Sequence, residues 1–376
     1  MKKKLLSVFL CAAMTATMLV GCSSKNNAAT TETPAATEEA AATDDAAATT
    51  DAVATDDAAA TADAAADAAQ GVDGKKVGVC IYKFDDNFMT LYREELQRYL
   101  EAGGATVTVM DGKNDQAEQT NQIQNFITEG VDVLIINLVQ ASAAEQVTNQ
   151  CNDAGIPVVF INREPEVAEE ERWQADGIKA TYVGADARQS GTYQGELIAD
   201  LPNKGDANGD GTVGYVMVMG DPENVDAQYR TEFSIKALES AGVKVSELDK
   251  QRGDWDQAKG QEITANALTA QGDAIDVVFC NNDAMALGAL QAIEAAGRTV
   301  GKDIYLVGVD ALTEALENVQ SGKMTGTVFN DHIGQAHTAA DTAAKFIAGE
   351  TVAPVNMVDY VKVTTDNAAD ILALLK

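Results

Sequence analysis

The chain has 376 residues, which is enough for two or three domains of ordinary size. It carries 58 acidic and 27 basic residues, a net charge of −31. Nucleic acids and anionic lipid surfaces are bound by clustered lysine and arginine. This balance therefore argues against nucleic acid as a partner and against adsorption to a lipid surface.

The first 22 residues indicate that the chain is exported. A basic start at Lys2–Lys4 is followed by an apolar run, Leu5–Val20, and by small residues, a pattern typical of a secretory signal peptide at 1–21. The ending Leu-Val-Gly-Cys resembles the bacterial lipoprotein box, which implies cleavage before Cys22 and lipidation of its thiol. The alternative is an uncut membrane anchor, for which the apolar run has only marginal length. We expect an exported lipoprotein, on the cell surface or the periplasmic side, that meets the membrane only through its lipid.

Residues 22–73 consist almost entirely of alanine, threonine, aspartate and glutamate, with Lys25 as the one basic residue and no aromatic residue. Such a segment buries too little apolar surface to offset its conformational entropy. We therefore predict a disordered acidic linker. The alternative, an isolated alanine-rich helix, is weakened by the repeated threonines.

From Lys75 onward, short apolar runs alternate with amphipathic stretches of helix length. The predicted strands are Val77–Tyr82, Thr106–Met110, Val133–Leu138, Pro157–Asn162, Val213–Met219, Val243–Leu248, Val277–Cys280, Tyr305–Val309 and Thr325–Phe329. The predicted helices include Asn87–Ala102, Gln116–Glu129, Ala141–Asp153, Ala187–Ala199, Asp226–Ser240, Gln257–Ala270, Ala284–Ala296 and Ile333–Ala348. Continuous apolar strands between helices predict an α/β fold with two doubly wound parallel sheets. Cys80 and Cys280 lie inside such strands and are expected to be buried.

Asparagine or aspartate follows several predicted strands directly. In open α/β sheets, ligands bind just beyond the carboxyl ends of the strands. Carboxylates accept hydrogen bonds and amides both donate and accept, which suits the hydroxyl groups of a neutral polyol. For any one of these residues the alternative is a helix N-cap. The recurrence favours a shared polar pocket, which Phe88 and Trp255 could cover with aromatic rings.

The motifs of the common enzyme classes are missing from the sequence. No glycine-rich phosphate loop follows any predicted strand, and there is no G-x-S-x-G motif. His332 and His337 are five residues apart, which does not suit a metal site on one helix face. The adjacent Asp85 and Asp86 point different ways from a strand end and make a poor acid/base pair. We therefore expect no enzymatic activity.

The sequence Asp206-Ala-Asn-Gly-Asp-Gly matches the start of an EF-hand loop, with Thr212 placed to offer a backbone carbonyl. The match fails at position twelve, where Met217 replaces the bidentate glutamate. Either this is a turn without metal, or the missing carboxylate comes from elsewhere in the chain.

From Lys75 to Lys376, the chain resembles the periplasmic glucose/galactose-binding proteins, which belong to the type I solute-binding family and serve sugar ABC transporters. The segments that carry the resemblance are Ile81–Met89, Ile136–Val139, Asn281–Met285, Gly308–Leu312 and Gly326–Asp331. The resemblance implies that Phe88 and Trp255 sandwich a sugar ring. It also implies that Asn224, where the family usually has histidine, helps to bind the hydroxyls. The other implied hydrogen-bonding residues are Asp86, Asn137, Asp226, Arg230, Asn282, Asp310 and Asn330.

The resemblance further implies two lobes joined by a three-strand hinge. We expect 74–156 with 332–360 in the N-terminal lobe and 157–331 with 361–376 in the C-terminal lobe. In the family a distant carboxylate completes the calcium loop, and the matching position is Asp276. The implied structural Ca²⁺ ligands are Asp206, Asn208, Asp210, Thr212 and Asp276.

The expected ligand is a monosaccharide, glucose or galactose, that closes the lobes of a monomer for delivery to an ABC transporter permease. Another hexose or a pentose stays open, because Asn224 alters the pocket. A receptor that reports to a chemoreceptor or a sensor kinase is a second possibility. A LacI-type repressor core would have the same fold, but the export signal and the lack of a basic helix-turn-helix argue against it.

Overall fold

The computed structural model describes residues 67–375. The predicted signal peptide, the predicted lipidation site Cys22 and most of the predicted linker lie outside the described residues. Within the described part, no helix has the length and apolar character needed to cross a membrane.

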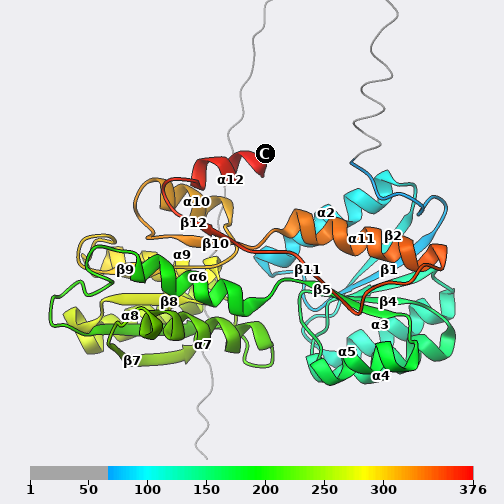
Figure 1. The fold of residues 1–376 in the computed structure, drawn as a ribbon, viewed down its shortest axis with the longest axis horizontal. Coiled ribbons are helices and arrows are strands. Elements are labelled where there is room, and N and C mark those ends of the chain that lie inside the picture. Colours follow the sequence, from blue (N-terminus) through cyan, green and yellow to red (C-terminus); the bar gives the residue numbers. More distant parts are fainter. Residues whose placement is uncertain (1–66, 376) are drawn as a thin grey trace, which may run out of the picture. The chain divides into compact units, whose positions relative to one another are not determined.

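The first lobe is built on a six-stranded parallel sheet (Figure 1). Its strand order is β11-β5-β4-β3-β1-β2. The bounds are β1 Lys76–Ile81, β2 Thr106–Asp111, β3 Val133–Ile136, β4 Val158–Ile161, β5 Ala180–Gly184 and β11 Val355–Met357.

Helices cover both faces of this sheet. Side chains of β1 therefore alternate between two buried clusters, one on each face. Val79 packs in a cluster with residues of α2 and α11, whereas Cys80 packs in another with residues of α3 and α4. Figure 1 shows α2 and α11 on one face and α3, α4 and α5 on the other. The bounds are α2 Asn87–Ala102, α3 Gln116–Glu129, the short helix η1 Ala141–Ala143, α4 Ala144–Ala154, α5 Val167–Asp176 and α11 His332–Ala348.

The second lobe has a four-stranded parallel sheet of order β7-β6-β8-β9 and an antiparallel pair, β10-β12. Its strands are β6 Val213–Met219, β7 Val245–Arg252, β8 Val277–Cys280, β9 Tyr305–Val307, β10 Thr327–Phe329 and β12 Val361–Val363. Its helices are α6 Ala187–Ala199, α7 Val225–Ser240, α8 Gln257–Gln271, η2 Gly272–Ala274, α9 Asp283–Ala295, α10 Thr313–Gln320 and α12 Ala368–Leu374. The predicted doubly wound α/β fold is confirmed.

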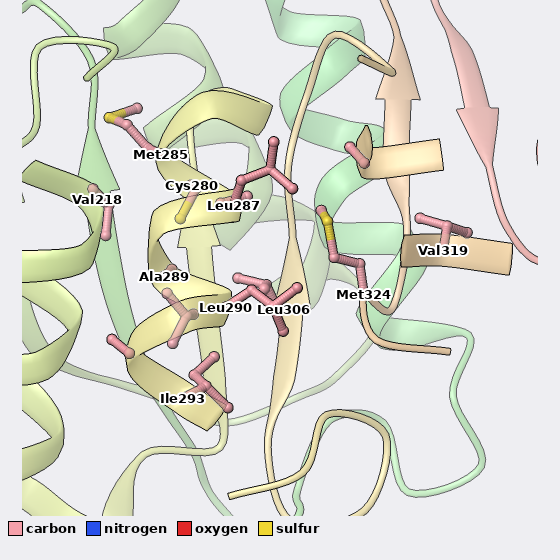
Figure 2. Packing of buried hydrophobic residues seen from close by; sticks show 14 of the residues in the cluster. Val218, Cys280, Met285, Leu287, Ala289, Leu290, Ile293, Leu306, Val319 and Met324 are labelled. Atoms are coloured by element: carbon pink, nitrogen blue, oxygen red, sulfur yellow. The ribbon is translucent and has the colours of Figure 1, made fainter. Parts of the chain in front are cut away.

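The core of the second lobe lies on both sides of this sheet. Figure 2 shows one cluster, in which Val218, Cys280 and Leu306 come from three neighbouring strands and Leu290 and Ile293 come from α9. Cys280 is free and buried, as is Cys80, so the prediction for these two residues is confirmed.

The chain first passes to the second lobe after β5, and the prediction of a passage near 156–157 is wrong. Strand β4 pairs with β3, and β5 pairs with β4, so residues 157–184 belong to the first lobe. The chain returns between β10 and α11. It passes over again between β11, which pairs with β5, and β12, which pairs with β10.

The first lobe also begins earlier than the predicted linker boundary at residue 73. Val72 is fully buried in the cluster beneath α2. The backbone N–H of Ala69 donates to the carbonyl oxygen of Tyr99 at 3.1 Å. The alanine-rich composition hid this short packed segment, because these residues do not differ in type from the linker before them.

Candidate functional site

One cavity gathers side chains from the carboxyl ends of strands in both lobes. It contains nine of the ten predicted ligand residues. From the first lobe the lining residues are Tyr82, Asp86, Phe88, Met89, Asn162 and Arg163. From the second lobe and the passage after β10 they are Asn224, Asp226, Arg230, Trp255, Asn282, Asp310 and Asn330.

Asn137 is the predicted ligand residue that does not line the cavity. It is fully buried, and its Nδ2 donates to the carbonyl oxygen of Ile161 and to Oδ1 of Asn162, both at 3.1 Å. Its Oδ1 accepts from the backbone N–H of Tyr82 at 3.2 Å. Asn137 therefore ties two strand ends together and positions Asn162, which takes its place at the cavity.

Three cavity residues are also helix N-caps. A polar residue after a strand can therefore both cap a helix and line the cavity. Oδ1 of Asp86 accepts from the backbone N–H of Met89 at 2.8 Å. Oδ1 of Asn224 accepts from that of Asp226 at 3.1 Å, and Oδ1 of Asn282 from that of Met285 at 3.0 Å. Capping uses the oxygen of each amide and leaves its NH₂ group for other acceptors.

Arg230 is the central cation of the second-lobe wall. Its Nη1 donates to the carbonyl oxygen of Asn281 at 2.8 Å, and its Nη2 donates to Oδ2 of Asp226 at 3.3 Å and to the Tyr360 hydroxyl at 3.0 Å. Asp310 lies 4.0 Å from Nη1. Within residues 67–375, Nε of Arg230 is buried without a hydrogen-bond partner.

The two buried carboxylates beside Arg230 have pKa values that are raised towards neutral pH. Burial raises the pKa of Asp226 to about 6 and that of Asp310 to about 7, and Arg230 opposes both shifts. Nδ2 of Asn330 donates to Oδ1 of Asp310 at 3.2 Å, and Nε2 of Gln335 donates to Oδ1 of Asn330 at 2.6 Å. This chain of hydrogen bonds orients the amide of Asn330 at the cavity.

Two aromatic residues line the cavity as predicted. Phe88 is buried and makes an edge contact with Tyr92, with ring centroids 6.1 Å apart. Trp255 has a left-handed backbone, φ 67°, and lies three residues after the end of β7. A Cβ at Gly220 would collide with the Trp255 ring, so glycine at this position leaves room for the indole.

Arg163 and Asn162 were missed as site residues. They follow β4, a strand that the sequence had predicted. Asn162 adopts a left-handed backbone with φ 61°. The rule of polar residues after a strand applies here as well and would have found both.

The loop at Asp206 is closed by hydrogen bonds of the protein itself. Oδ1 of Asp276 accepts from the backbone N–H groups of Ala207 at 3.0 Å and Asn208 at 2.9 Å, and its Oδ2 accepts from that of Gly214 at 2.8 Å. Asp206 in turn accepts from the N–H of Gly211 at 2.9 Å. Both oxygens of Asp276 therefore face backbone donors.

This arrangement does not fit a calcium ion held bidentately by Asp276, since such a ligand turns both oxygens to the metal. In the described part of the chain, the cluster whose spacing suits a metal is Asp67, Glu95 and His337, far from this loop in sequence. Arg98 already pairs with both carboxylates of that cluster. Calcium binding stays a prediction from the sequence, and we derive no step from it.

Comparison with known proteins places the chain in a family. Residues 77–351 match the model of the periplasmic binding protein domain. The chain is 34% identical to the D-galactose/methyl-galactoside binding periplasmic protein MglB of Haemophilus influenzae, over 79% of this chain and 92% of that protein. It is also 34% identical to a putative rhizopine-binding protein of Rhizobium meliloti, over 78% of this chain and 91% of that protein.

Among solved structures, the chain is similar to an ABC transporter solute-binding protein of Bacillus halodurans with bound myo-inositol. The TM-score is 0.70 and the identity 30%, over 80% of this chain and 98% of the other. These matches agree with the two-lobed fold and confirm the prediction that the chain is not an enzyme. The chain belongs to the periplasmic binding protein family, whose members are exported solute-binding proteins.

Proposed function

We propose that the protein captures one neutral monosaccharide in the cavity between its lobes and delivers it to an ABC importer, with glucose and galactose as the first candidates. The observation that carries the proposal is the convergence of polar side chains from the strand ends of both lobes on one cavity that Phe88 and Trp255 also line. Such a lining matches a ring with hydroxyls at its edge and C–H groups on its faces.

The charges in the cavity favour a neutral ligand. Asp86, Asp226 and Asp310 stand against Arg163 and Arg230. Arg230 pairs with Asp226 at 3.3 Å and approaches Asp310 at 4.0 Å. A sugar acid would bring a further negative charge beside Asp226 and Asp310, and an amino sugar would bring a further cation beside Arg163 and Arg230. Burying either charge costs free energy.

The relatives support a sugar or a related cyclic polyol. MglB is named for galactose and methyl-galactoside, and the Bacillus halodurans protein holds myo-inositol. Asn224 stands where the glucose/galactose-binding proteins usually have histidine. For this reason another hexose, a pentose and a cyclic polyol belong in the test.

A thermal-shift screen of the full chain tests the proposal. The panel contains glucose, galactose, allose, ribose, xylose and myo-inositol, with galacturonate and glucosamine as charged counterparts. We expect a neutral member to raise Tm, because a ligand that binds only the folded state stabilises it. If ribose or xylose raises Tm while glucose and galactose do not, the hexose assignment is wrong. If only a charged sugar does so, the neutral-ligand proposal is wrong.

The matched variants are Asp310→Asn in the cavity and Asp303→Asn outside it. Asp310→Asn should abolish or strongly reduce the Tm shift, whereas Asp303→Asn should keep it. Asp303 sits in a turn of the second lobe, where its carboxylate accepts from the backbone N–H of Thr299.

The second part of the proposal is that the mature chain is a monomer anchored through a lipid on Cys22, with residues after it serving as the tether. Mass spectrometry of the protein from membranes should find a diacylglycerol-modified N-terminal cysteine. Recovery of a chain that begins with an unmodified residue would contradict the anchor.

A receptor role beside transport is a second candidate function. A signalling partner could recognise the closed, sugar-bound form just as a transporter would.

A further inference from the structure

Arg163 of the first lobe reaches Asp221 of the second. Arg163 follows β4 and Asp221 follows β6. Nη1 of Arg163 lies 3.6 Å from Oδ2 of Asp221, and the two side chains are 1% and 11% exposed. This buried ion pair therefore joins the two lobes directly beside the cavity.

The first lobe holds the guanidinium of Arg163 on its own side of this contact. Nη1 donates to the carbonyl oxygen of Val139 at 2.6 Å. The guanidinium carbon lies 3.9 Å from the centroid of the Tyr82 ring, which is a cation–π contact. Both partners belong to the first lobe, so they can keep Arg163 in place whatever the second lobe does.

The second lobe holds Asp221 in the same way. Its Oδ1 accepts from the backbone N–H of Glu223 at 3.1 Å and from Nη2 of Arg252 at 3.2 Å. Its Oδ2 is the oxygen that faces Arg163. Asp221 itself is not among the residues that line the cavity. It can therefore act on a ligand only through Arg163 or through the position of the lobe.

Arg163 does line the cavity, and it is incompletely satisfied there. Its Nε and Nη2 are buried and, within the described residues, have no hydrogen-bond partner. Leaving buried donors unpaired costs free energy, which opposes closure of an empty cavity. A ligand that offers hydroxyl or ring oxygens to Nε and Nη2 removes that cost.

From these contacts we propose that Arg163 and Asp221 form a latch that couples ligand binding to closure of the lobes. The ligand satisfies the free donors of Arg163, and Asp221 then holds the same guanidinium from the second lobe. Asp221 is thus a positioning residue that never touches the ligand. The inference rests on the proposed function, since it needs a ligand in the cavity.

Asp221→Asn tests the latch, with Asp303→Asn as its matched control. Both aspartates accept a backbone N–H on Oδ1, and both pair with an arginine, since Oδ1 of Asp303 lies 3.5 Å from Nε of Arg298. The pair of Asp303 lies within the second lobe, whereas that of Asp221 joins the lobes. The measurements are Kd by calorimetry and the radius of gyration by X-ray scattering, on the full chain with and without galactose, glucose or myo-inositol.

We expect Asp221→Asn to weaken the Kd by about tenfold and to reduce the ligand-induced fall in the radius of gyration. Asp221→Glu, which keeps the charge, should recover most of both effects, and Asp303→Asn should behave as wild type. If Asp221→Asn equals Asp303→Asn in both measurements, or weakens binding with undiminished compaction, the latch is wrong while the proposed function stands. If the wild type binds none of the three ligands, the proposed function fails and the latch fails with it.

Discussion

Asp310 is the residue through which the cavity responds to pH. Burial raises the pKa of its carboxyl from the ordinary value of 3.8 to about 7, against the opposing effects of Arg230 and Asn330. The folded protein therefore binds this proton more tightly than the unfolded chain does. By linkage, the contribution of Asp310 to the free energy of unfolding falls as the pH rises from about 4 to about 7.

Asp310→Asn should remove this part of the pH dependence. Between pH 4.5 and pH 8, the ligand-free wild type should lose about 3 kcal/mol more of its free energy of unfolding than Asp310→Asn does, as measured by urea denaturation. Asp303→Asn should follow the wild type. Parallel pH profiles of wild type and Asp310→Asn would contradict the assignment.

Asp276 holds the loop that begins at Asp206 through hydrogen bonds to its backbone. Its two oxygens accept from three backbone N–H groups of the segment 207–214. In Asp276→Asn an amide NH₂ would face one of these donors, so we expect a loss of about 1–3 kcal/mol in the free energy of unfolding. The same loss should appear with and without a chelator.

Asp210→Asn is the control for Asp276→Asn. It keeps the oxygen that accepts from the Thr212 N–H and should leave stability within about 0.5 kcal/mol. A large fall in Tm on adding a chelator to the wild type, together with a destabilised Asp210→Asn, would instead establish the calcium site.

Glycine allows close packing between helices α8 and α9. A Cβ at Gly288 would collide with the backbone carbonyl of Gln257. Gly288→Ala should therefore force the helices apart and lower the free energy of unfolding by about 1–3 kcal/mol, measured by urea denaturation. Gln291→Ala, on the exposed side of α9, should change it by less than about 0.5 kcal/mol. Equal denaturation midpoints for the two variants would show that the contact is not tight.

Long apolar strands and their polar ends could be predicted from the sequence. Val213–Met219 and Val277–Cys280 have the predicted bounds, because runs of buried residues leave few alternatives. Strand β5, with the sequence Ala-Thr-Tyr-Val-Gly, was not predicted because it is short and mixed in composition. Strands β11 and β12 have only three residues each and carry exposed side chains.

The assignment of strands to sheets could not be predicted in the same way. The apolar run of β4 would suit the sheet of either lobe. Which strands it pairs with depends on tertiary contacts that its own sequence does not show. Arg163 escaped for a related reason, since its partner Asp221 is 58 residues away in sequence and belongs to the other lobe. Asn137 is a polar residue at a strand end, as a ligand-binding residue would be. Its amide NH₂ group, however, donates to Ile161 and Asn162 at the end of the neighbouring strand.

At the scale of the whole molecule, the chain passes between the lobes three times, after β5, after β10 and after β11. Asn330, at the second of these passages, lines the cavity. A ligand that contacts both walls favours the closed arrangement by its contacts to the second wall. Recognition of the sugar and the signal to a transporter are thus parts of one equilibrium.

Calorimetric titration of the full chain with galactose and with glucose tests the central claim most directly. We predict saturable binding of at least one of them, with one sugar per chain, and loss of that binding in Asp310→Asn but not in Asp303→Asn. Absence of binding by either sugar, by the other neutral sugars and by myo-inositol would contradict the claim, as would tighter binding of galacturonate or glucosamine.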